Sequence, residues 1–310
     1  MRRTAALIAT VGLLAALTAC SAPSSQADCT GGYSSGTASE GIMVTGDFGS
    51  KPDVTVPTPF NASSTQVSTL IPGSGHPIEK GSLVTVEATL VDGSTGEVVQ
   101  STGYDGTDAA SIVAGSASLA PGISDSLLCA QVDSRIAVAI SPDDAVAEGS
   151  SASADTPTVI AVFDIVSASL PRANGAQQAP QNNVPTVTLD EDGVPGIVKQ
   201  NGDAPTTLQK ATLKKGDGAT VTADDTVTVN YTGWVWSSGE IFDSSWQKET
   251  PASFSPNNVI PGFKDALVGA TVGSQVEVVI PPDQGYGDTA QGSIPAGSTL
   301  IFVVDILGIN

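Results

Sequence analysis

The chain repeats itself, and this repetition constrains its fold more than any other feature of the sequence. A shift of 143 residues places Gln66–Thr102 on Gln209–Ser245 without a gap. Further along, a shift of 141 residues places Thr158–Ile165 on Thr299–Ile306. A length of 310 residues accommodates two domains of ordinary size. The sequence therefore predicts two copies of one domain.

Changes in composition mark the boundaries of the copies. The first copy is expected to cover residues 41–172 and the second residues 184–310. Residues 173–183 between them are rich in Asn and Gln and poor in apolar side chains, which predicts a linker. Residues 20–40 are rich in Ser, Ala, Gly and Thr, which predicts a flexible tether.

The first residues have the pattern of an export signal. Arg2 and Arg3 precede a short apolar run that ends in Leu-Thr-Ala-Cys at Cys20, so residues 1–19 are predicted to be a signal peptide. This ending is typical of lipoprotein signals, in which Cys20 is lipidated and becomes the first mature residue. The alternative is an ordinary secretory peptide with an incidental cysteine. The lipoprotein interpretation predicts an extracytoplasmic protein, lipid-anchored to the outer face of a bacterial cell membrane.

Charge and side-chain inventory exclude several classes of partner. A net charge of −20 repels phosphate backbones, so no nucleic-acid partner is expected. The chain has one histidine, which leaves no basis for a histidine-rich metal site, and no metal or cofactor is predicted. Cys29 and Cys129 would lie outside the cell, where disulfides persist. Whether they pair stays open, because spacing alone does not supply the geometry.

The hydrophobic pattern of the second copy predicts strands and one short helix. Val227, Val229 and Tyr231 alternate with polar neighbours, as in a strand with one buried face. Pro261 suits a first helical position and Gly269 a helix end, so a helix is expected over residues 261–268. Antiparallel strands that bury one face against a short helix make an α+β domain.

Five separated blocks of the second copy carry a family resemblance. They are V-T-V-N-Y-T-G (Val227–Gly233), G-E-I-F-D-S-S (Gly239–Ser245), N-V-I-P-G-F-K-D-A-L (Asn258–Leu267), I-P-P-D-Q-G-Y-G (Ile280–Gly287) and I-P-A-G-S-T-L-I-F-V-V-D-I (Ile294–Ile306). Together they resemble the FKBP-type peptidyl-prolyl cis-trans isomerases (EC 5.2.1.8). The resemblance implies two FKBP-like domains, each a twisted antiparallel sheet wrapped around one short helix. It also implies a role in protein folding, with proline-containing segments of exported proteins as substrates and macrolide inhibitors as ligands.

Rotation about a prolyl bond requires the loss of amide resonance, with a barrier of about 18–20 kcal/mol. An apolar site with a few fixed hydrogen-bond donors favours the twisted amide and needs no nucleophile. The resemblance implies a catalytic set of Tyr231, Phe242, Asp243, Ile260 (through its backbone N–H), Tyr286 and Phe302. It implies a substrate-binding set of Phe254, Val259, Phe263 and Ile294.

The two copies differ at these positions. Tyr231, Phe242, Asp243, Phe263, Tyr286 and Phe302 correspond to Ala88, Val99, Gln100, Ile123, Val146 and Ala161 in the first copy. We therefore expect the first copy to be a degenerate, non-catalytic domain. Two departures from the family, Ala252 in place of an aromatic residue and a short loop at residues 287–293, bear on macrolide affinity. The alternatives are a membrane-anchored chaperone or binding module with weak or no isomerase activity, and a lipoprotein that binds a small molecule.

Overall fold

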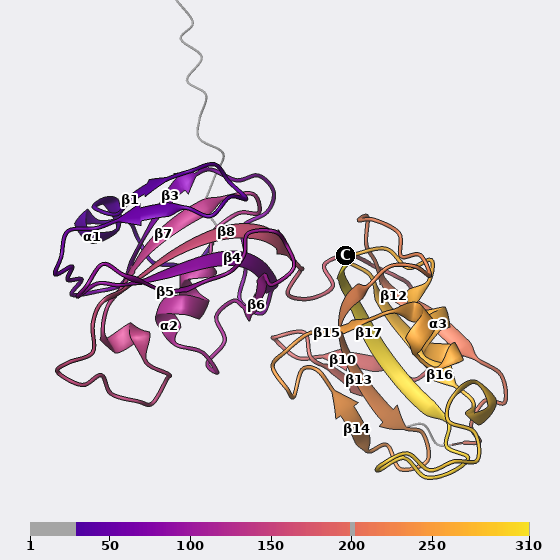
Figure 1. The fold of residues 1–310 in the computed structure, drawn as a ribbon. Helices are drawn as coiled ribbons and strands as arrows, with labels where there is room; N and C mark the ends of the chain where they lie inside the picture. Colours follow the sequence, from indigo (N-terminus) through magenta and orange to yellow (C-terminus); the bar gives the residue numbers. More distant parts are fainter. Residues whose placement is uncertain (1–28, 199–201, 310) are drawn as a thin grey trace, which may run out of the picture.

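A computed structural model describes residues 29–198 and 202–309 of the chain (Figure 1). The predicted signal peptide, Cys20 and residues 20–28 of the predicted tether lie outside the described residues. The described chain forms two bodies built on separate β-sheets. The first body carries β1 to β8 and the second body carries β9 to β17. Within the described ranges, no helix is long and apolar enough to span a bilayer.

The first body is built on a six-stranded antiparallel sheet with the strand order β3-β7-β8-β4-β5, and β6 also pairs with β4. Its strands are β3 (Gln66–Ile71), β4 (Leu83–Asp92), β5 (Val98–Ser101), β6 (Ala110–Val113), β7 (Arg135–Ile140) and β8 (Val159–Ala168). The short helix α2 (Pro121–Ser124) continues into the 3-10 turn η1 (Asp125–Leu127), and η2 (Asp143–Ala145) follows β7.

The second body is built on a seven-stranded antiparallel sheet with the order β14-β13-β17-β16-β12-β9, and β15 also pairs with β13. Its strands are β9 (Ala176–Gln177), β12 (Gln209–Lys215), β13 (Val227–Val235), β14 (Ile241–Ser244), β15 (Ala252–Phe254), β16 (Gln275–Ile280) and β17 (Leu300–Ile309). The helix is α3 (Pro261–Leu267), flanked by the 3-10 turns η3 (Pro256–Asn258) and η4 (Pro282–Gln284).

The two sheets share one topology. The order β3-β7-β8-β4-β5 of the first body matches β12-β16-β17-β13-β14 of the second. Even an irregularity repeats, because the register of β4 against β8 shifts at Thr85/Val86 and that of β13 against β17 shifts at Thr228/Val229. These two positions are related by the shift of 143 residues seen in the sequence. The predicted fold class, two α+β FKBP-like domains, is confirmed.

The helix-facing core of the second body follows from the predicted alternation. Val227, Val229 and Tyr231 of β13 lie in one buried cluster with residues of α3. In α3, Pro261 occupies the first turn, and Phe263, Ala266 and Leu267 are buried. The helix ends one residue earlier than expected, with Val268 as its C-cap.

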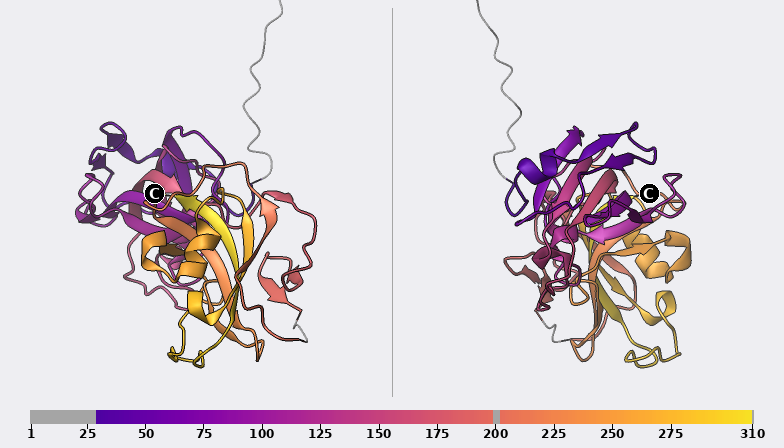
Figure 2. Two further views of the ribbon diagram at one scale, coloured as in Figure 1. Left: turned by 90° about the vertical axis from the view of Figure 1, so that its right-hand side faces the viewer. Right: turned by 60° about the vertical axis from the view of Figure 1, so that its left-hand side comes forward.

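Each sheet is also covered on its second face, which the sequence did not indicate. In the first body, α1 (Thr37–Glu40), β1 (Met43–Thr45) and β2 (Asp53–Thr55) lie on the side opposite α2 (Figure 1). In the second body, the hairpin of β10 (Val187–Leu189) and β11 (Pro195–Ile197) covers Trp234 and Val303, opposite α3 (Figure 2, left). The strands β7 and β16 are therefore buried at every position.

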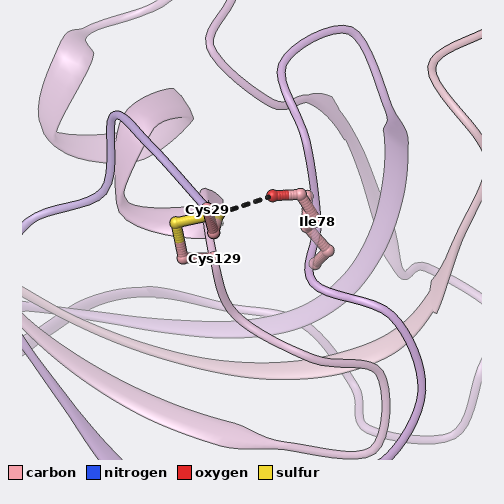
Figure 3. Close-up of a disulfide and its surroundings, with 3 residues drawn as sticks. All are labelled: Cys29, Ile78 and Cys129. Carbon is pink, nitrogen blue, oxygen red and sulfur yellow. Dashed lines mark hydrogen bonds between the residues drawn. A yellow bond between two sulfur atoms is a disulfide. The ribbon is translucent and has the colours of Figure 1, made fainter. Parts of the chain in front are cut away.

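The segments expected to be linker and tether make specific contacts. Within residues 173–183, β9 pairs with β12, and the backbone N–H of Ala173 donates to the Asp305 carboxylate over 2.8 Å. Within residues 20–40, α1 contributes the buried side chain of Ser39, and Cys29 forms a disulfide with Cys129 (Figure 3). The Sγ atom of Cys29 also lies 3.8 Å from the carbonyl oxygen of Ile78. The disulfide joins the start of the described chain to the segment after η1.

The bodies meet where the ends of their central strands approach each other. The backbone N–H of Leu170 donates to the carbonyl of Leu307 in β17 over 3.0 Å. Asn230 in β13 donates from its side chain to the carbonyl of Pro171 over 3.2 Å. Beside this junction lies a cavity of about 830 Å³ between the two bodies.

Candidate active site

Five aromatic rings from five different elements converge on the helix-facing side of the second sheet. Tyr231 lies in β13, Phe242 in β14, Phe254 in β15, Phe263 in α3 and Phe302 in β17. The ring centroids are 4.9 Å apart for Phe263–Phe302, 5.3 Å for Phe242–Phe302, 5.6 Å for Phe254–Phe263 and 5.7 Å for Tyr231–Phe254. These four contacts are edge-to-face, the geometry that the charge distribution of aromatic rings favours.

The cluster has a buried floor and a more open rim. Tyr231, Phe263 and Phe302 are buried, and Ile294 from the loop before β17 is buried in the same cluster. The partly buried residues packed against this floor include Phe242, Phe254, Val259 and Ile260. The structure therefore brings together eight of the ten residues implied by the resemblance in one apolar group, with rim side chains within reach of a ligand.

Asp243 and Tyr286 add polar atoms beside the rings. The hydroxyl of Tyr231 donates to Oδ2 of Asp243 over 2.5 Å, and Lys248 Nζ donates to Oδ1 over 2.5 Å. Tyr286 is 38% exposed, and after burial and Asp243 it is a further, smaller contributor to the raised pKa of Tyr231, which places it near that phenol. All ten implied residues thus gather in one region of the second body.

The pair of Asp243 and Tyr231 has a defined protonation state at neutral pH. Burial raises the pKa of Tyr231, and the hydrogen bond to Asp243 raises it further, so the phenol stays protonated. Burial alone would raise the pKa of Asp243 as well. The hydrogen bonds from Lys248 and Tyr231 outweigh that effect and lower the pKa of the carboxyl group below its ordinary value. The site therefore holds a fixed negative charge beside a phenol that donates to it.

The backbone N–H of Ile260 is an available donor. Ile260 is the N-cap of α3 with an extended backbone conformation, and its carbonyl accepts from Phe263 and Lys264. Its own N–H makes no hydrogen bond to any of the residues in 29–198 and 202–309. Pro261 at the first helical position leaves this donor in place. A carbonyl group of a bound peptide can therefore accept from it.

Gly233 makes room for the rings, a role that sequence reasoning missed. Gly233 pairs with Phe302 across β13 and β17. A Cβ atom at this position would lie 2.5 Å from Cζ of Phe242 and 2.9 Å from Cε1 of Phe302. Because real Cβ contacts are longer, any side chain here would displace a ring. The glycine at the end of V-T-V-N-Y-T-G, combined with the strand register, could have indicated this role.

Lys248 and the serines after Asp243 were also missed. Ser245 Oγ accepts from the Tyr231 N–H over 2.9 Å and donates to the Asn230 side chain, while Ser244 hydrogen-bonds Thr232 over 2.9 Å. These bonds fix the backbone on both sides of Asp243. The Ser-Ser pair after Asp243 was a visible signal, whereas nothing in the sequence marks Lys248 as the partner of that carboxylate.

The first body keeps this scaffold and carries different side chains at the corresponding positions. Thr102 Oγ1 accepts from the Ala88 N–H over 3.0 Å, as Ser245 does from Tyr231. Opposite each other in β4 and β8 stand Leu90 and Ala161, at the positions of Gly233 and Phe302. The large and small residues have exchanged strands, so that Leu90 occupies volume that an aromatic ring fills in the second body.

The family model and the relatives found by sequence support the same assignment. The family model described as FKBP-type peptidyl-prolyl cis-trans isomerase matches residues 218–307. An FK506-binding protein of Streptomyces anulatus is 37% identical over 119 residues, which cover 37% of this chain and 96% of that protein. An FKBP-type 22 kDa peptidyl-prolyl cis-trans isomerase of Escherichia coli is 44% identical over 103 residues, or 33% of this chain and 50% of that protein. The crystal structure of FkpA from Escherichia coli aligns with 40% of this chain and 51% of that chain, at 31% identity and a TM-score of 0.32.

The fold and the converging aromatic residues of the second body define a prolyl isomerase domain. The chain belongs to the FKBP-type peptidyl-prolyl cis-trans isomerases and is an enzyme of class EC 5.2.1.8.

Proposed function

We propose that the chain isomerises Xaa-Pro bonds of exported proteins at the aromatic cluster of the second body. The observation that carries this proposal is the convergence of five rings beside the hydrogen-bonded pair of Tyr231 and Asp243. An extended proline-containing segment would place its pyrrolidine ring on the floor of Tyr231, Phe263 and Phe302. The aromatic surroundings and the free N–H of Ile260 then act on the amide that rotates.

The chemistry follows from what changes during rotation. A planar amide is polarised by resonance, and the twisted amide has lost that resonance and part of its polarity. Water stabilises the planar form, so transfer to an apolar surface lowers the barrier by favouring the twisted form. The Ile260 N–H and the Tyr286 hydroxyl hold carbonyl groups of the bound segment. The ionised Asp243 keeps the Tyr231 ring in place and presents a fixed charge next to the rotating group.

We further propose that the first domain, residues 41–172, is non-catalytic. Six site positions of the second copy are aliphatic or Gln in the first, and Leu90 fills volume that Phe302 occupies in the second body. A scaffold retained without its site is consistent with holding clients or with positioning the enzyme. We assign residues 173–183 as the connection and residues 184–310 as the catalytic domain.

The location belongs to the proposal as well. Lipidation of Cys20 after removal of residues 1–19 would anchor the chain to the outer face of the cell membrane, with residues 20–40 as the tether. The disulfide between Cys29 and Cys129 is compatible with an oxidising compartment. Substitution Cys20→Ala should move the protein from the membrane fraction to the medium. Retention of that variant in the membrane fraction would exclude this anchor.

The test of activity is the refolding of a protein whose slow phase is limited by prolyl isomerisation, with the mature chain added in catalytic amounts. We expect Phe302→Ala and Asp243→Ala to lower the acceleration by about tenfold or more, which corresponds to about 1.4 kcal/mol of transition-state stabilisation. Asp283→Ala, at an exposed acidic residue outside the site, is the matched control. Circular dichroism verifies that each variant is folded. An unchanged rate with both site variants would favour the alternative of a chaperone or binding module.

A further inference from the structure

The first body exposes aliphatic side chains at positions that correspond to the rim of the prolyl site. Val99 in β5 is 62% exposed and corresponds to Phe242. Leu119, in the loop before α2, is 38% exposed and corresponds to Val259. In the second body, Phe242 and Val259 pack against the buried core of the aromatic cluster. In the first body, Val99 and Leu119 leave much of their apolar surface exposed to water.

The residues at the corresponding floor positions are also aliphatic. Ala88 and Ala161 are buried, and Leu90 and Ile123 pack against the same core. Gln100 stands at the position of Asp243, so the fixed charge of the catalytic site has no counterpart here. The aliphatic surface consists of Leu90, Val99, Leu119, Ile123 and Val146, and the buried Ala88 and Ala161 belong to the core beside it. It has the position of a peptide site, without the aromatic rings and the carboxylate that catalysis uses.

The strand at the border of this surface has a free edge. β5 ends the strand order of the first sheet, and among the strands of residues 29–198 and 202–309 it pairs with β4 alone. Its residue Val98 is 51% exposed, and the strand carries neither a charge nor a proline, the usual protection of a sheet edge. An extended polypeptide can therefore add backbone hydrogen bonds along β5 while its apolar side chains contact Val99.

The cavity between the two bodies is lined by segments next to both regions in the sequence. On the first body its lining includes residues 113–117, the segment that leads to Leu119. On the second body it includes Trp246, Glu249 and Pro251, which follow Asp243 and flank its partner Lys248. The volume of about 830 Å³ is sufficient for several residues of an extended chain.

We propose that the aliphatic surface of the first body binds extended apolar segments of the unfolded polypeptides whose prolyl bonds the second body isomerises. The identity of these clients rests on the proposed function, and the binding surface rests on the first body alone. The surface would hold a client near the catalytic site through several cycles of release and rebinding. Held in this way, the client is presented at a high effective concentration.

The probe is a permanently unfolded protein, reduced and carboxymethylated lysozyme with a fluorescent label, titrated with the mature chain. The test variant combines Val99→Glu and Leu119→Glu. The control combines Met43→Glu and Val166→Glu, at first-body residues that are 60% and 44% exposed and lie outside the aliphatic surface. Turnover of a short proline-containing tetrapeptide, which is too small to reach both bodies, is measured in parallel.

We expect the test variant to weaken binding of the unfolded protein about tenfold, with the control unchanged and tetrapeptide turnover within about twofold of the unmodified chain. A milder variant, Leu119→Ser, should give a smaller loss of the same kind. Equal affinity of the test variant and the unmodified chain would overturn the proposal, as would an equal loss in the control. Binding that depends on Val99 and Leu119 in a chain without tetrapeptide turnover would contradict the proposed function and leave this surface established.

Discussion

At the scale of single residues, Gly233 determines whether the aromatic cluster can form. In Gly233→Ala, the new methyl group would lie 2.5 Å from the Phe242 ring, so this ring must move off Phe302. We expect kcat/KM for a prolyl peptide to fall about tenfold and stability to fall by about 1–3 kcal/mol, the usual cost of overpacking. In Gly308→Ala the methyl group would meet Ser169 at 3.7 Å, an ordinary contact, and this control should keep full activity. Unchanged activity of Gly233→Ala would show that the Phe242 position does not matter.

Lys248 controls the charge of Asp243, and the effect should be visible in the pH dependence. The pKa of Asp243 lies below its ordinary value because the hydrogen bonds from Lys248 and Tyr231 outweigh burial. A depressed pKa keeps the carboxylate ionised, and its contribution is lost only as the pH falls through the folded-state pKa. In Lys248→Met we expect the acid limb of the kcat/KM profile to move to higher pH. Stability should change by less than about 1 kcal/mol, because both side chains are partly exposed.

The control for this substitution is Lys264→Met. Lys264 donates to the Asn257 side chain and has no contact with the Asp243 carboxylate in the described chain. Its pH profile should match that of the unmodified enzyme. An acid limb that stays in place in Lys248→Met would mean that the hydrogen bonds from Tyr231 and the Ser244 backbone determine the ionisation of Asp243 without Lys248.

At the scale of elements, the sheet face that the hairpin of β10 and β11 covers also carries the buried carboxyl group of Glu277. Glu277 in β16 lies on the face with Val279, opposite α3, and neither of its oxygens has a hydrogen-bond partner among the described residues. Burial raises its pKa from 4.5 to about 8. A raised pKa for an acid means that folding favours the protonated form. The folded state therefore loses stability as the pH rises from about 4.5 to about 8, and the loss is complete above that range.

Substitution Glu277→Gln should remove this pH dependence. At about 1.36 kcal/mol per pH unit, the interval corresponds to at most about 5 kcal/mol in the second body. We expect the stability of Glu277→Gln relative to the unmodified chain to increase by a few kcal/mol between pH 5 and pH 8, measured by urea unfolding. Glu240→Gln, at an exposed residue of the same body, is the control. A constant difference across this pH range would mean that Glu277 is hydrated or paired in solution.

The strand pairing also predicts that two substitutions in the first body, at Ala161 and Leu90, compensate each other in side-chain volume. Ala161→Phe in the first body should overpack the core beside Leu90 and cost about 1–3 kcal/mol. Adding Leu90→Gly recreates the arrangement of Gly233 and Phe302 and should recover part of that loss, less about 1 kcal/mol for glycine in a strand. The unfolding transition of the first body measures both effects. Additive losses in the double variant would show that the two positions do not share volume.

The limits of prediction from sequence also appear at this scale. Alternation in β13 and the proline and glycine around α3 identified these elements, because their period and punctuation are local properties. β9 is two residues long and has no period, so only its pairing with β12 reveals it. The coverage of each sheet's second face depends on contacts between distant segments. In the site, resemblance assigned the aromatic residues, whereas Lys248 is identifiable only from its distance to Asp243.

At the scale of the whole molecule, the two bodies should respond separately to reduction. The disulfide between Cys29 and Cys129 closes a loop with a sequence separation of 100 residues within the first body. Such a cross-link stabilises chiefly by restricting the unfolded chain, and its loss costs about 2–5 kcal/mol. The second body contains no disulfide in its described residues, and the buried residues of its helix-facing core and aromatic cluster come from β13, β16, β17, α3 and the loops between them.

We therefore expect Cys29→Ser with Cys129→Ser to lower the Tm of the first transition in a thermal scan and to leave tetrapeptide turnover unchanged. Below that first transition, binding of the unfolded protein should persist, because the first body is still folded and β5, which carries Val99, keeps its pairing with β4. Above it, binding should be lost while turnover continues, since the prolyl site needs only the second body. A simultaneous loss of binding and turnover would show instead that the bodies unfold as one unit, held together by contacts such as the bond from Leu170 to Leu307.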